Sequence, residues 1–102
     1  MADRIQELAQ DAHDKLDKMV GPKDAATSFE DISAVTRKVV LMRDELIDRL
    51  RADANAPGVR SMLDRVNSLL SLTVSSETPL QGIHWERMQE CRDKLGEIAK
   101  GG

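Results

Sequence analysis

Residues 27–53 read TSFEDISAVTRKVVLMRDELIDRLRAD, and this stretch decides the fold. Its apolar residues recur every three or four positions, which is the period of one face of an α-helix. A central stripe is expected from Ile32, Val39, Leu46 and Leu50, widened by Phe29, Val35, Val40, Met42 and Ile47. Thr27 and Glu30 have the spacing of a capping box. The pattern therefore predicts a long amphipathic helix over about residues 28–53.

Three further segments have the same helical period. The first helix is expected over residues 2–19, ended by Gly21 as a left-handed cap and by Pro22. A helix over residues 57–74 is expected to hold Pro57 in its first turn. A last helix is expected over residues 79–100, with Thr78 as its N-cap. No segment alternates with the period of a strand.

Four amphipathic helices with short connections predict an all-α fold, a single domain over residues 1–102 arranged as an antiparallel up-down four-helix bundle. The alternative is a three-helix core with a loosely docked N-terminal helix, because residues 2–19 have the smallest apolar side chains. Leu46 and Leu70 lie near the centres of their stripes, so both are expected to be buried.

Composition narrows the class of protein. The net charge of the chain is −3, whereas a nucleic-acid-binding surface carries an excess of basic residues. No apolar run reaches the roughly 18 residues of a membrane span, and residues 1–7 are too charged for a signal peptide. The single cysteine, Cys91, suits a reducing compartment. We therefore expect a cytoplasmic protein whose partner is neither a membrane nor nucleic acid.

The histidines raise the question of phosphotransfer. Histidine phosphotransfer domains are also four-helix bundles of this size, with Lys three residues after the His and then Gly. His13 is followed at that spacing by Leu16 and Asp17, so the likeness is one of size and fold only. A phosphotransfer-type signalling domain acting through His13 or His84 is the alternative function.

Other chemistry has weaker support in the sequence. His84, Met88 and Cys91 share one stripe of residues 79–100 and are soft-metal ligand types, yet a core stripe explains Met and Cys more simply. No nucleophile with an adjacent base and no Gly-rich phosphate loop occurs. We therefore expect no catalytic residue, no metal and no cofactor, and an inert, buried Cys91.

Three polar residues fall inside apolar stripes: Arg43, His84 and Arg87. A charge in a core must be paired or must reach water along its aliphatic stem. Arg43 is therefore expected to meet a carboxylate or water at the end of the bundle. The pair Arg43 and Arg87 also leaves open a second alternative function, a bundle that binds an anion or a small ligand.

Three apolar residues are expected outside the core: Leu41, Leu72 and Trp85. Apolar side chains left outside a bundle gain stability only by meeting another surface, and Trp is prominent at such contacts. The leading interpretation is a non-enzymatic helical-bundle protein that acts through protein–protein contacts, as an adaptor, regulator or subunit. Its partner is another protein or a second copy of itself.

Overall fold

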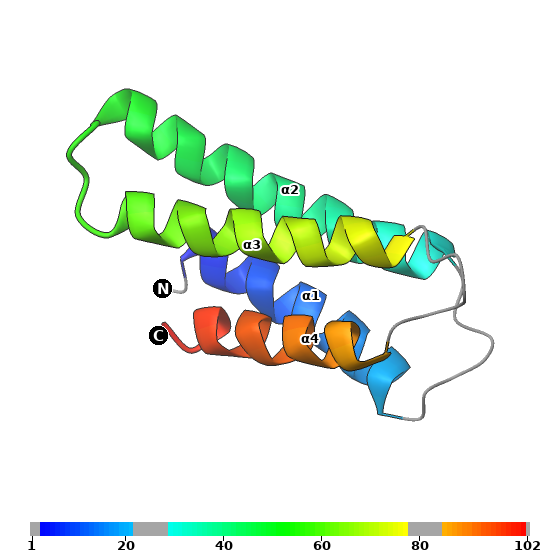
Figure 1. Cartoon of the computed structure of the whole chain (residues 1–102). Helices are drawn as coiled ribbons and strands as arrows, with labels where there is room; N and C mark the ends of the chain where they lie inside the picture. The colour runs from blue at the N-terminus through cyan, green and yellow to red at the C-terminus, as the bar shows by residue number, and fades with distance from the viewer. Residues whose placement is uncertain (1–2, 22–28, 78–84, 102) are drawn as a thin grey trace.

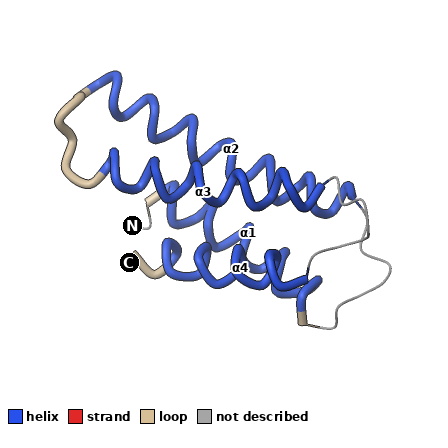
Figure 2. The backbone as a smooth tube through the Cα atoms, viewed as in Figure 1, coloured by secondary structure: helices blue, strands red, loops and turns tan. Residues whose placement is uncertain are grey.

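The computed structural model describes residues 3–21, 29–77 and 85–101. Within these ranges the chain forms helices and no strand, as Figure 2 shows. The helices are α1 (Arg4–Val20), α2 (Phe29–Ala52), α3 (Val59–Glu77) and α4 (Trp85–Ala99). Successive helices run in opposite directions (Figure 1), so the predicted all-α antiparallel bundle is confirmed. None of these described helices is long and apolar enough to cross a membrane.

The helices pack as two closely associated pairs. α1 lies along α4 and α2 lies along α3, while α1 also packs against α2. α3 and α4 share a smaller contact, and α2 lies diagonally across the bundle from α4. At the end where the two termini lie, the α2–α3 hairpin projects past them (Figure 1).

α1 is an integral part of the core. Its expected stripe is fully buried, with Ala9 and Ala12 at 0% exposure. Small side chains let a neighbouring backbone come close, and on α4 a Cβ built at Gly96 would lie 3.2 Å from Cδ2 of His13. The alternative of a loosely docked N-terminal helix is therefore wrong, because the apolar stripe of α1 is buried in the core, its smallest members included.

α2 buries a continuous row that we call the inner seam: Ile32, Val35, Val39, Met42 and Leu46. The spacing of three and four residues keeps the row on one side of the helix. Thr36 is buried beside it, and its hydroxyl donates to the backbone oxygen of Ile32 at 3.2 Å. Because this hydroxyl is satisfied within its own helix, a polar residue is tolerated in the core.

Near its C-terminal end, α3 buries a polar residue and exposes the apolar residue beside it. Thr73, which is 4% exposed, is the core residue, and its hydroxyl donates to the backbone oxygen of Leu70 at 3.0 Å. Val74, the apolar residue next to it, is instead 48% exposed. Thr73 follows Val66 by seven residues, so it continues the helical repeat of buried positions. The sequence alone favours Val74 for this position, because Val74 is the apolar residue of the two. Leu70 is only half-buried, which corrects the expected full burial.

The helix ends show which local signals were informative. Asp3 is the N-cap of α1 and forms a capping box with Gln6. Gly21 ends α1 in a right-handed conformation, with φ −54°, and not as the expected left-handed cap. Pro57 lies outside α3, because Gly58 next to it has φ +75° and this cannot belong to a helix. The caps expected at Thr27 and Thr78 lie outside the described residues.

Truncating a side chain of the inner seam should lower the free energy of unfolding. Leu46 is 2% exposed, so Leu46→Ala is expected to lower the free energy of unfolding by about 2–5 kcal/mol, through lost burial and the cavity left behind. Leu41→Ala, on the exposed side of the same helix, is the matched control and should cost below about 0.5 kcal/mol. Urea denaturation followed by circular dichroism measures both. Equal losses would show that the register of α2 is wrong.

Candidate functional site

The exposed apolar side chains gather on the α2–α3 half of the bundle. Among the described residues, the large hydrophobic side chains that are exposed are Leu41 at 44% and Val74 at 48%. Two further apolar residues of α2, Val40 and Ile47, are half-buried and lie outside the core cluster. The exposed large apolar side chains of the described residues therefore both belong to the α2–α3 pair.

The other two residues expected at an interface lie elsewhere. Leu72 is half-buried and packs against the core, where it lines a small cavity with Met88 and Cys91. Trp85, at the start of α4, is also half-buried against the core. Because α4 lies diagonally across the bundle from α2, the structure does not bring Trp85 and Leu41 into one surface.

The polar residues expected in the core reach the surface or lie outside the described part. The side chain of Arg43 is 36% exposed and reaches Oδ1 of Asp44 at 3.5 Å, although its Nε is buried with no hydrogen-bond partner in the described structure. Arg87 is exposed on α4, at the border of that helix's buried stripe and not within it. His84 lies outside the described residues. Arg43 and Arg87 stand on diagonal helices, so they do not form a joint anion site.

Sequence reasoning missed an ion pair that fastens α1 to α2. Arg49 donates two hydrogen bonds to the carboxylate of Asp3, one of them 3.0 Å long from Nη1 to Oδ2. The same carboxylate accepts from the backbone N–H of Ile5 at 3.0 Å. Arg49 lies three residues after Leu46, so it occupies the next position of the inner-seam repeat, where α2 reaches the solvent. That position, with the Asp3–Gln6 capping pattern, was the available signal.

The bonds at Asp3 set its charge state. Hydrogen bonds from the Arg49 guanidinium and then from the backbone of Ile5 lower the pKa of Asp3 below its ordinary value of 3.8. Asp3 reciprocally raises the pKa of Arg49. Both side chains are more than one-third exposed, so water and salt screen much of this attraction.

A cavity of about 260 Å³ opens beside this ion pair, at the end of the bundle that holds the termini. Its apolar wall includes Leu46, Met62 and Ile98, and Asp3 and Arg49 line its polar side. Sites for small molecules usually enclose about 300–1,000 Å³ with unengaged polar groups. The guanidinium of Arg49 already donates to Asp3, so it is engaged and does not offer an anion a binding group in this cavity.

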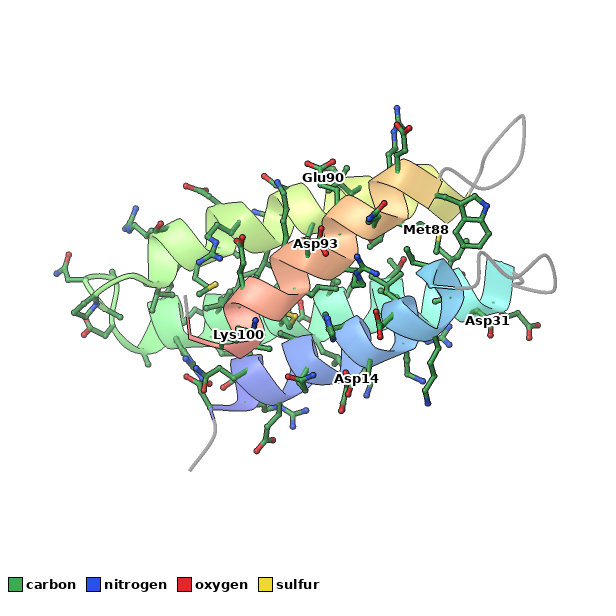
Figure 3. The ribbon with its side chains drawn as sticks, turned by 90° about the horizontal axis from the view of Figure 1, so that it is seen from below. Asp14, Asp31, Met88, Glu90, Asp93 and Lys100 are labelled. Atoms are coloured by element: carbon green, nitrogen blue, oxygen red, sulfur yellow. The ribbon has the colours of Figure 1, made fainter. Side chains whose placement is uncertain are left out.

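His13 is accessible but stands in acidic surroundings. Its side chain is 28% exposed, and its Nδ1 lies 3.1 Å from Oδ1 of Asp14. A carboxylate only accepts, so Nδ1 carries the proton of this bond. Asp17 lies one helical turn further along α1, and Asp14 and Asp93 line the side of the molecule seen in Figure 3. Arg92 pairs with both Asp17 and Asp93, so Asp14 is the carboxylate that directly opposes a doubly charged phosphoryl group on the ring.

Cys91 is a core residue. It is 2% exposed, and burial raises the pKa of its thiol to about 12, with the charge of Glu90 adding to the rise. The thiolate is the reactive form, so the thiol is inert at neutral pH. Among the described residues, no three His, Cys, Asp or Glu side chains gather closely enough to hold a metal ion.

Comparison of the chain with protein-family models, with curated proteins and with solved structures finds no match.

Removal of the Asp3 side chain should weaken the α1–α2 junction. Asp3→Ala is expected to cost about 1–2 kcal/mol of unfolding free energy at pH 7, since it removes both the cap and the ion pair. Asp3→Asn keeps a capping oxygen and should cost below about 1 kcal/mol.

The difference in unfolding free energy between wild type and Asp3→Asn should become smaller as the pH falls. A depressed carboxyl pKa stabilises the fold above the ordinary value of 3.8, and this gain is lost as the pH falls through the lower folded pKa. Urea titrations at pH 7 and near pH 3 should therefore show the difference shrinking in acid. A difference that grows in acid would contradict the ion pair.

The thiol of Cys91 should report opening of the core. In the native protein at pH 8, a disulfide reagent such as dithionitrobenzoate should modify it at least about 100-fold more slowly than free cysteine. The rate should rise in urea together with unfolding, because only the open chain exposes the sulfur. Rapid modification of the folded protein would show that Cys91 is accessible.

Proposed function

We propose that this chain is a non-enzymatic helical-bundle protein that acts through protein–protein contacts, with the outer side of the α2–α3 pair as its contact surface. The observation that carries the proposal is the accessibility of Leu41 and Val74, at 44% and 48%, on that pair. Single exposed apolar residues are common, but here Val40 and Ile47 add half-buried apolar surface on the same pair of helices. Such a surface gains stability when a partner covers it.

An adaptor or regulatory role in the cytoplasm goes with this proposal. Cys91 is a free thiol without a disulfide, which suits a reducing compartment. Phosphotransfer through His13 has less support, because the accessible ring has Asp14 and Asp17 as neighbours. A ligand site also has less support, since neither Arg43 nor Arg87 lines the cavity at the bundle end.

Replacing both exposed apolar residues should remove the contact and leave the fold intact. The variant Leu41→Asp/Val74→Asp, used as bait in affinity capture from host cells, should recover less than about one-tenth of the partner bound by the wild type. Gln89→Asp, an exposed position on α4, is the matched control and should capture the partner normally. Far-ultraviolet circular dichroism checks that each bait is helical. Undiminished capture by a folded double variant would refute this assignment of the surface.

A further inference from the structure

α2 carries a second row of residues with helical spacing, on the side away from the core. We call it the outer seam: Glu30, Ala34, Arg37, Leu41, Asp44, Asp48 and Arg51. Its members are spaced alternately by four and three residues, the spacing by which helices pair along a common line. All are exposed except Ala34, which is half-buried. Leu41 stands at the middle of this row.

Four of the five charges of the outer seam alternate with a regular period. Glu30, Arg37, Asp44 and Arg51 follow one another at seven-residue intervals, about 10.5 Å apart along the helix. The order of signs is negative, positive, negative, positive. This order of four signs inverts about the midpoint of residues 30–51, next to Leu41, so each of the four charges has an opposite charge at the same distance on the other side. The remaining charge of the seam, Asp48, pairs with Arg51 of its own helix at 3.7 Å.

We propose that the outer seam of α2 docks on the same seam of a second copy of this chain, with the two helices antiparallel and a two-fold axis beside Leu41. In that arrangement Arg37 faces Asp44 of the second copy, and Glu30 faces Arg51. Each contact occurs twice, as two-fold symmetry requires. In a parallel pairing every charge would instead face its own sign.

The charges are available for such a contact. Neither Glu30 nor Arg37 has an ion-pair partner in the described part of the chain. Arg51 has only a 3.7 Å pair with Asp48, and these two side chains are 78% and 70% exposed. Asp44 has its 3.5 Å contact with Arg43. Exposed pairs of this kind contribute little, so exchanging them for partners on a second copy costs little.

The proposal rests on the proposed function, because it names the partner of the same surface. Charge complementarity decides for a second copy, since the four alternating charges Glu30, Arg37, Asp44 and Arg51 invert about their own centre and so are complementary to themselves. Leu41 then lies beside its own counterpart at the axis. The contact thereby covers part of the apolar surface left exposed on α2.

Two single charge reversals test the geometry. Arg37→Glu alone should place like charges opposite one another, and so should Asp44→Arg alone. Each should raise the dimer dissociation constant at least about tenfold in sedimentation equilibrium at low salt.

An equimolar mixture of the two variants should form a heterodimer near wild-type strength. The two substituted side chains then face one another with opposite charges across the axis, and the unchanged Asp44 of one variant faces the unchanged Arg37 of the other. Lys15→Glu on α1, with the same change in net charge as Arg37→Glu, is the control and should leave association unchanged.

The outcomes separate this inference from the proposed function. A wild-type chain that stays monomeric up to about millimolar concentration overturns the inference, and so does a mixture that recovers no association. In either case, loss of partner capture by Leu41→Asp/Val74→Asp would still support the proposed function. Circular dichroism of every variant confirms that the comparison is made between folded chains, and recovery in the mixture itself requires both variants to be folded.

Discussion

Burial of the inner seam of α2 positions the other helices, because α2 packs against both α1 and α3. Each fully buried aliphatic side chain of this seam contributes roughly 1.5–3 kcal/mol through removal from water. Val35, Val39 and Met42 are all at 0% exposure, so the seam is covered from two sides. α1 packs against α2 and also lies along α4, and α4 closes the bundle against α3.

Polar contacts at the edges of these helix pairs fix which helices are neighbours. Asp3 and Arg49 join α1 to α2, and a 3.3 Å pair between Asp17 and Arg92 joins α1 to α4. Each pair is exposed and adds little stability. Their value lies in register, since a helix shifted by one turn would separate the partners by about 5.4 Å. The apolar seams thus provide the stability, and the edge charges favour one alignment.

The sequence was most informative where apolar residues alone define a stripe. The buried positions of α1, such as Leu8 and Leu16, follow directly from the period, and so do Leu95 and Ile98 of α4. Errors arose where a polar residue occupies a core position, because its burial depends on a hydrogen bond made within the fold. Thr73 is the example on α3. Pairwise contacts over long sequence separation, such as Asp3 with Arg49, are not specified by periodicity, which places Arg49 at the end of its row but does not name its partner.

The candidate site was predicted only in part for the same physical reason. Leu41 is exposed as expected, because it lies opposite the inner seam on a helix whose register is unambiguous. Leu72 and Trp85 pack against the core, since a side chain at the border of a stripe can turn towards a neighbouring helix whose position the sequence does not give. Arg87, at the border of the stripe on α4, turns to the solvent.

The composition of the outer seam determines what kind of contact it can form. Leu41 and Ala34 are its apolar members, whereas an obligate dimer buries an apolar surface comparable to a divided core. Charged residues therefore supply most of the complementarity, and charges at an exposed seam are screened over about 8 Å at physiological salt. A contact built in this way is weak, reversible and sensitive to ionic strength. Such a contact between two copies would therefore form and dissociate as concentration and ionic strength change.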